Sequence, residues 1–363
     1  MNDIQIYVLR HTYYAHLSDS EAAENIATDK GFTYSGVRGQ LSRAKHSNAA
    51  KAALMKALNQ HAPEVPISVK RQLSVISASE AEFEEWSTVN EPRRGVFISD
   101  THKPYLRADA YQLALEIIQY FQPHAITALN DGLENKGYGR HEDTEAIFQM
   151  LWRGDFANAL KVETAYHRDL SSLLTPTGKL LGLMGNHDRW IFDFWRANDP
   201  QTAEYKIAEY MEKLYHTDNV LMFSRGVYEN HIHLSSGLVW THGLTTAKNP
   251  LSRAKTVLSY FMENGVAKSV VQGHVHDAFT IEGARVGMRG VTFVQNGMLR
   301  NTDVDWMHRD MRDWRMTITL VEYNPQEWAH KVHLVPFEVE KDMLVARFRG
   351  NEWAVKLDTS KPL

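Results

Sequence analysis

The larger, C-terminal part of the sequence predicts a mixed α/β (α+β) fold, because short apolar runs alternate there with helical patterns. Val96–Ser99 and Ala125–Leu129 have the length of buried strands, and the apolar residues of Ala108–Phe121 recur between them at helical spacing. A strand, a helix and a second strand in this order are typical of parallel strands joined by a crossover. Four more apolar runs, each followed by polar or Gly-rich residues, repeat this pattern: Lys179–Met184, Leu238–Thr241, Ser269–Gln272 and Val291–Val294.

The N-terminal part is predicted to form a small helical unit. Ser18 and Glu21 make a capping box at the start of a helical pattern. Gly31 interrupts that pattern, and a second helix is expected to begin at an N-capping Thr33. The charges around this second helix are all basic: Lys30, Arg38, Arg43, Lys45, Lys51 and Lys56. Two interpretations stay open, a helix-turn-helix that contacts DNA phosphates and a helical cap or dimer contact with a solvated basic face.

Three segments are expected along the chain. They are a small helical domain over residues 1–71, a linker over residues 72–94 and the α/β domain over residues 95–363. The segment that ends near Pro92 is Ser-rich and acidic, which is typical of a domain boundary. A chain of 363 residues is longer than one typical domain, so a large domain with a small appendage is the natural expectation.

The composition excludes several kinds of site. Because there is no cysteine, the chain has no disulfide, no thiolate zinc site and no cysteine nucleophile, which leaves oxygen and imidazole ligands for a metal. The formal net charge of -4 is small for this length, so a basic surface for nucleic acid must be local. The first residues lack the features of a signal peptide, and no stretch reaches the roughly 18 apolar residues of a membrane span. We therefore expect a cytoplasmic protein without a membrane partner.

Five polar motifs follow the apolar runs, at the points where the predicted strands end. A carboxylate and an imidazole together are a common ligand pair for a divalent metal. Each motif alone is more often a turn or a satisfied polar pair, but five of them after successive strand-like runs favour a metal site. The motifs are Asp100-Thr101-His102, Asn130-Asp131, Gly185-Asn186-His187-Asp188, Thr241-His242-Gly243 and Gly273-His274-Val275-His276.

Taken in order, these motifs resemble the signature of the calcineurin-like metallophosphoesterases: Asp-x-His, Gly-Asp-x-x-Asp, Gly-Asn-His, His-Gly and Gly-x-His. The resemblance covers the chain from residue 96 to about residue 340. It implies a four-layer αββα sandwich of two mixed sheets flanked by helices. The His-Lys-Pro sequence that starts at His102 and the Arg140-His141 pair are similar to phosphoesterases common in bacteriophages and prophages, which implies a phage-infected or prophage-bearing bacterial cell.

The resemblance also implies two sets of metal ligands. One ion would be held by Asp100, His102, Asp131 and His276, and the other by Asp131, Asn186, His242 and His274. Asp131 would bridge the two ions. Two such cations activate a shared water near neutral pH and clamp the phosphate oxygens, so no protein nucleophile is needed. These ligands fit Mn, Fe or Zn, and we favour two Mn ions because oxygen ligands and water are numerous.

Further roles are implied for residues outside the two ligand sets. His187 is expected to hydrogen-bond the phosphate or to protonate the leaving oxygen. The sequence departs from the family pattern at Asn130, where Gly is usual, and at Glu134, where a second Asp is usual. Glu134 is the expected partner that orients the ring of His187, and Asp188 is the second candidate for a catalytic, orienting or structural role.

The resemblance implies a phosphate-ester substrate, and the class of ester stays open. Arg140 and His141 are expected near the mouth of the site, where they either contact the substrate phosphate or are solvated. We favour a phosphodiesterase or nuclease acting on DNA, to which the basic N-terminal helices would bring it. The first alternative is a phosphomonoesterase or phosphoprotein phosphatase, since the motifs specify phosphoryl chemistry but not the leaving group. The second is a nucleic-acid-binding regulatory protein with a weak metal centre.

Overall fold

A computed structural model describes most of the chain. It covers residues 19–30, 33–44, 67–103, 105–133, 155–198, 201–222, 231–243, 247–262, 266, 268–300 and 314–358. The chain forms two compact units, one of residues 1–72 with 195–208 and one of residues 73–194 with 209–363. In the described residues, no helix combines the length and the apolar character needed to cross a lipid bilayer.

The larger sheet of the second unit has eight strands in the order β13-β12-β11-β10-β1-β2-β3-β4. The strands β1 to β4 are parallel, and β10 to β13 pair with antiparallel neighbours. All five residues of β2 are buried, as expected for a parallel strand covered on both faces. The bounds are β1 (Arg93–Phe97), β2 (Ala125–Leu129), β3 (Lys179–Leu183), β4 (Val220–Met222), β10 (Thr317–Tyr323), β11 (His330–Glu340), β12 (Met343–Phe348) and β13 (Asn351–Lys356).

The smaller sheet has five strands in the order β5-β6-β7-β9-β8. Its central strands β6, β7 and β9 are parallel, and the edge strands β5 and β8 are antiparallel to their neighbours. The bounds are β5 (His231–Ser235), β6 (Leu238–Thr241), β7 (Ser269–Gln272), β8 (Phe279–Glu282) and β9 (Thr292–Gln295). The short apolar runs of the sequence therefore become strands in both sheets.

The two sheets share one apolar core. Phe97, Leu181 and Val321 of the larger sheet cluster with Trp240 and Val271 of the smaller sheet. The rings of Phe97 and Trp240 meet edge to face at 5.7 Å between centroids. A β-carbon at Gly95 would lie 2.8 Å from the Trp240 ring, so only glycine lets the indole approach the strand this closely. The inner faces of the sheets therefore form the middle of the sandwich.

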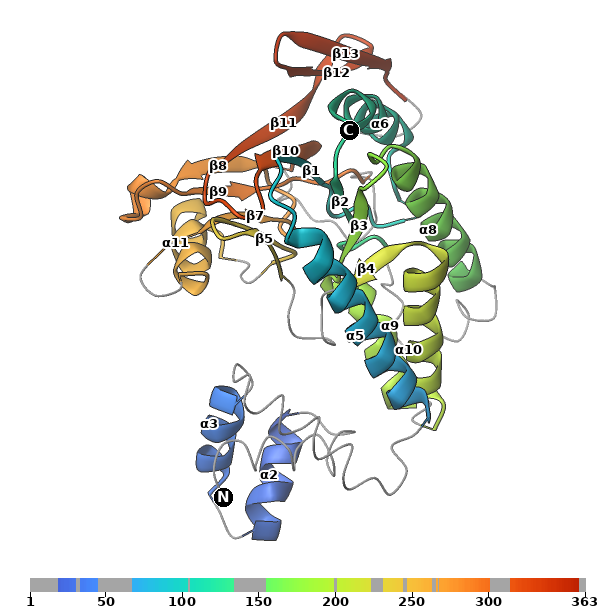
Figure 1. The fold of residues 1–363 in the computed structure, drawn as a ribbon, viewed down its shortest axis with the longest axis vertical. Helices are drawn as coiled ribbons and strands as arrows, with labels where there is room; N and C mark the ends of the chain where they lie inside the picture. The colour runs from blue at the N-terminus through green and yellow to red at the C-terminus, as the bar shows by residue number, and fades with distance from the viewer. Residues whose placement is uncertain are drawn as a thin grey trace. The chain divides into compact units, whose positions relative to one another are not determined.

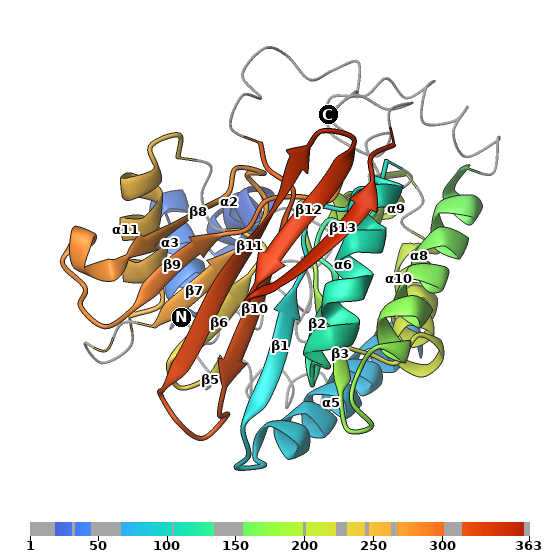
Figure 2. The ribbon, with the colours of Figure 1, turned by 90° about the horizontal axis from the view of Figure 1, so that it is seen from above.

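Helices cover the outer faces of both sheets (Figure 1, Figure 2). Beside the larger sheet lie α6 (Ala108–Phe121) and α8 (Asp155–Ser172), and α6 buries a stripe that includes Leu113, Ile117 and Phe121. Beside the smaller sheet lies α11 (Pro250–Tyr260), where the Asn249 side chain caps the helix by accepting from Ser252 N at 3.0 Å. The predicted four-layer sandwich of two mixed sheets is thus confirmed.

Helix α5 (Ile67–Ser87) occupies most of the segment that the sequence suggested as a linker. Its Ala and Glu residues favour a helix, and the apolar side chains of Phe83 and Trp86 pack against the sandwich core. The Trp86 ring also lies under the Arg93 guanidinium at 3.9 Å, at the start of β1. Residues 72–87 of the predicted linker are therefore helical, while the three domain boundaries stay a prediction.

The first unit contains the two predicted N-terminal helices, α2 (Asp19–Lys30) and α3 (Tyr34–Ala44). They pack through a small apolar cluster that includes Ala23, Ile26, Val37 and Leu41. The remaining helical segments in the described part of the chain are α9 (Asn186–Asn198), α10 (Ala203–Glu212), the π-helix η2 (Lys213–Thr217) and the 3-10 helix η3 (Gly283–Val286).

Candidate metal centre

The metal-ligand candidates from the sequence stand at the ends of strands from both sheets. Asp100 and His102 follow β1, and Asp131 follows β2. Because the carboxyl ends of parallel strands share one edge of a sheet, their side chains can converge there. The other candidates are Asn186 after β3, His242 after β6, and His274 and His276 after β7.

The backbone of these loops adopts a conformation that non-glycine residues rarely have. Positive φ angles occur at Asp100 (56°), His102 (44°), Asp131 (58°), His274 (78°) and His276 (67°). Such left-handed residues are uncommon and concentrate at binding and active sites, where the surrounding structure holds them in place. Two backbone bonds of 2.9 Å, from Asp100 N to Asn130 O and from His102 N to Asp131 O, join the loops after β1 and β2.

A first ligand group forms around Asp100. Its Oδ1 lies 3.1 Å from His276 Nε2, and the Nε2 atoms of His102 and His276 lie 3.2 Å apart. Two atoms bound to one ion at about 2.1 Å are roughly 3.0–3.4 Å apart, so these distances suit a shared cation. Burial lowers the pKa of His276, which keeps the ring neutral as a metal requires. Burial alone would raise the pKa of Asp100, but His276 and His102 hold it well below its usual range.

A second ligand group forms around Asp131. The Nε2 atom of His242 lies 3.1 Å from both Asp131 Oδ2 and Asn186 Oδ1. Burial, together with the neighbouring His242, lowers the pKa of His274 to about 4. The Nδ1 atom of His274 is buried and has no hydrogen-bond partner among the described residues. A neutral imidazole with such a nitrogen fits a metal ligand.

The two groups form one continuous centre. Three sets of side chains have donor atoms within 4.8 Å of one another: Asp100, His102 and His276; His102, Asp131 and His187; and Asp131, His242 and His274. His102 and Asp131 each belong to two sets, so the sets overlap instead of standing apart. The oxygen and imidazole donors gathered here suit divalent metal ions.

The calcineurin-like phosphoesterase profile matches residues 94–278, which is just over half of the chain. The chain belongs to this family. Together with the clustered ligands, the family indicates a metal-dependent phosphoesterase, a hydrolase whose centre lies at the strand ends described above. A comparison with curated proteins found no match.

The side chain of Asn130 contacts His242, and it stands at the position where the family pattern usually has Gly. Its Oδ1 lies 2.8 Å from His242 Nδ1, and its Nδ2 donates to Ile98 O at 2.7 Å. In a neutral His242 ring, donation from Nδ1 leaves Nε2 unprotonated, facing Asp131 and Asn186. The sequence showed the departure from the family pattern, but only the fold shows that the amide contacts the ring of His242, a candidate metal ligand.

Asp188 holds the loop that carries Asp131. Its Oδ2 accepts from Asp131 N at 2.9 Å and from Gly185 N at 2.8 Å, and its Oδ1 accepts from Leu133 N at 3.4 Å. Burial, and then the nearby Asp131 charge, raises the pKa of Asp188 to about 7. A β-carbon at Gly185 would lie 2.0 Å from Asp131 Oδ1, which excludes any larger residue there. The contacts of Asp188 suit an orienting role.

His187 lies at the rim of the centre, half-buried at the start of α9. Its backbone N donates to Asp131 Oδ1 at 2.8 Å, and its ring meets the His102 ring at 4.6 Å between centroids. The Trp190 ring lies 3.9 Å from the His187 ring, between centroids, one helical turn later. The sequence analysis missed this contact, although the spacing of three residues on a helix was its signal.

Three predicted residues lie outside the described part of the chain: Glu134, Arg140 and His141. Their expected roles, orienting His187 and contacting the substrate phosphate, therefore stay predictions. The structure brings the other candidates together at one edge of the sandwich.

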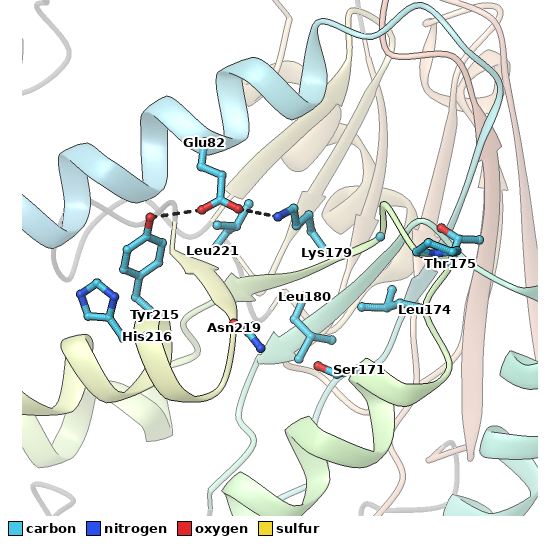
Figure 3. Close-up of a pocket in the computed structure, with 12 residues that line it drawn as sticks. Glu82, Ser171, Leu174, Thr175, Lys179, Leu180, Tyr215, His216, Asn219 and Leu221 are labelled. Atoms are coloured by element: carbon cyan, nitrogen blue, oxygen red, sulfur yellow. Dashed lines mark hydrogen bonds and ion pairs between the residues drawn. The ribbon is translucent and has the colours of Figure 1, made fainter.

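The structure also has a cavity of about 550 Å³, whose lining residues are drawn in Figure 3. It is lined by residues at the amino ends of β3 and β4, such as Lys179, whereas the ligands follow the carboxyl ends of the parallel strands. Glu82 in this cavity pairs with Lys179 and accepts a hydrogen bond from Tyr215 at 3.1 Å. None of the ligand candidates lines it, so cavity volume does not identify the active site.

Proposed function

We propose that this phosphoesterase uses two divalent metal ions, with Mn favoured, to hydrolyse phosphodiesters in nucleic acid. The observation that carries the proposal is the position of Asp131, whose carboxylate belongs both to a group with His102 and to a group with His242 and His274. Divalent ions bound there would activate water and offset the negative charge on a phosphate.

Different side chains of the protein would bind the two ions. Asp100, His102 and His276 would hold one ion, and Asn186, His242 and His274 the other, with Asp131 between them. His187 is half-exposed beside both groups, so its ring can hydrogen-bond a phosphate oxygen or give a proton to the leaving oxygen. With no cysteine in the chain and no other nucleophile assigned, water is the proposed attacking group.

The choice of nucleic acid rests on the sequence of the first unit. The charges from Lys30 to Lys56 are all basic, and Arg38 is exposed on α3. Such a local surface suits phosphate backbones even though the net charge of the chain is slightly negative. The similarity of the His-Lys-Pro sequence at His102 to phage enzymes supports a cytoplasmic, phage-associated setting, which belongs to the same proposal.

The test is hydrolysis by the purified full chain, with Mn added and with a chelator. The substrates are a bis-aryl phosphodiester, an aryl phosphomonoester, and linear single- and double-stranded DNA, and Asp131→Asn is the control. Chelator-sensitive cleavage of the diester and DNA, lost in the control, is the expected result. Preference for the monoester would instead indicate a phosphatase, and no turnover on any substrate would contradict both enzymatic functions.

A further inference from the structure

A row of charged side chains lies behind the loops after β1 and β2. We call it the charge chain, and it consists of Lys103, Glu163, His167, Asp218 and Lys213. Lys103 Nζ lies 2.8 Å from Glu163 Oε2, and His167 Nδ1 lies 2.9 Å from Asp218 Oδ2. His167 Nε2 is 2.8 Å from Glu163 Oε1, an ion-pair distance without hydrogen-bond geometry. Lys213 Nζ ends the row, 3.1 Å from Asp218 Oδ2.

The inner members of the charge chain are almost completely removed from water. Lys103 and Glu163 are each 1% exposed and His167 is 0% exposed, whereas the Lys213 side chain is 30% exposed. Burying a charged pair carries a desolvation penalty that its attraction often fails to offset, so an apolar pair of similar size is frequently as stable. A gain in folding stability is therefore a weak explanation for the buried charges at these positions.

Lys103 is the point at which the charge chain reaches the metal centre. It follows His102 directly, and both its backbone N and its Nζ donate to Gly132 O, at 2.8 and 3.2 Å. Thr101 Oγ1 donates to the same oxygen at 3.2 Å. Gly132 follows Asp131, so these three bonds fix the carbonyl group of the residue next to the bridging candidate.

The Lys103 ammonium has little freedom to move. Besides Gly132 O and Glu163, it faces the Tyr166 ring at 3.7 Å from the ring centroid. Glu163 and Tyr166 are both on α8, one helical turn apart. The helix thus holds the lysine, and the lysine holds the carbonyl that follows Asp131.

We propose that Lys103 and Glu163 are positioning residues that hold Asp131 in its left-handed conformation, oriented between the two ligand groups. The inference rests on the proposed two-metal function. Outer partners of metal ligands typically change metal affinity by about 10- to 100-fold when they are removed. Both side chains are buried, so their expected effect on catalysis passes through Asp131.

The test uses the full chain and titrates Mn alone by calorimetry, with thermal unfolding measured in parallel. The double variant K103M/E163Q removes both buried charges, so it avoids the unpaired charge that either single change would leave. We expect a folded protein whose Mn affinity falls about 10-fold or more, because Asp131 belongs to both ligand groups. Lys213→Met is the matched control, because it removes the outermost charge of the charge chain and leaves the loops after β1 and β2 unchanged. Its Mn binding should equal that of the wild type.

Two results would overturn the inference. One is a K103M/E163Q protein that binds two Mn ions with affinities within twofold of the wild type. The other applies if that protein does not fold: Glu163→Asp keeps the charge but shortens the reach, and wild-type Mn binding by this variant also contradicts the positioning role. A wild type that binds no Mn is a different outcome, because it removes the two-metal function itself.

Discussion

The charged side chains at the two ends of the parallel strands differ in their exposure to solvent. At the carboxyl ends, Asp100 and Asp131 are at most 1% exposed, and both have positive φ angles. At the amino ends, the Lys179 and Glu82 side chains around the cavity are 31% and 37% exposed and pair with each other. The buried carboxylates with positive φ angles therefore gather at the carboxyl ends, among the candidate metal ligands, whereas the charged pair around the cavity stays closer to solvent.

This difference shows what marks a functional site in this molecule. The open cavity has volume, but its charged groups have partners and remain close to solvent. The metal centre instead concentrates buried donors that face one another at about 3 Å. Such an arrangement is unfavourable without a cation and favourable with one, so convergent buried donors are the better guide.

Of the substitutions that test the difference between the metal centre and the cavity, His187→Ala is expected to have the largest effect on activity. Removing a group that donates a proton to the leaving oxygen should lower kcat by about 10²- to 10⁴-fold. The loss should be smaller for an aryl ester with a good leaving group than for DNA. Steady-state kinetics on both substrates, with Mn binding measured alongside, checks this. If Mn binding is lost instead, His187 is a metal ligand, as its place in one ligand group allows.

Asn130→Gly is expected to weaken the metal centre itself. The change gives the residue usual in the family but removes the amide that faces His242 Nδ1 at 2.8 Å. Mn affinity should fall by about 10- to 100-fold, as for other partners that orient metal ligands. Calorimetric titration with Mn measures it, and unchanged affinity would mean that the His242 ring is oriented without Asn130.

A change at His167 should alter the pH dependence of stability. Burial disfavours the charged ring and Lys103 opposes its charge, but Glu163 and Asp218 raise the pKa of His167 above its ordinary value of 6.5. A raised pKa in the folded state stabilises the protein below about pH 6.5, and this stabilisation is lost as the pH rises through the folded-state pKa. Urea unfolding of the wild type and His167→Gln should therefore differ more at pH 6 than at pH 9.5. An equal difference at both pH values would show that the ring stays neutral.

The smallest effect is expected at the opposite end of the strands, from Lys179→Met. Partly exposed ion pairs contribute about 0–1 kcal/mol, so the free energy of unfolding should change by no more than that. Hydrolysis rates and Mn affinity should match the wild type. A substantial loss of activity in this variant would mean that the cavity affects hydrolysis at the metal centre. The two ends of the strands would then not differ in function.

Much of the sandwich could be predicted from local sequence. The runs Ala125–Leu129, Leu238–Thr241 and Ser269–Gln272 match β2, β6 and β7, and the helical pattern of Ala108–Phe121 matches α6. Strand and helix periodicity are local properties, so they can be read without knowing the partners. Helix α5 was missed because its Ser-rich, acidic composition resembles a boundary, while its packing through Trp86 depends on the distant sheets.

The sequence by itself determined the chemistry of the site, because the order of Asp, Asn and His residues after apolar runs specified which donors stand at the strand ends. It could not determine which groups support them. Asn130 and His242 are 112 positions apart, and Lys103 and Glu163 are 60 positions apart. Residues so far apart in the sequence form no local pattern. Only the packing of α8 and the smaller sheet against the loops after β1 and β2 brings their side chains together. The tertiary structure alone therefore decided how the ligands are held.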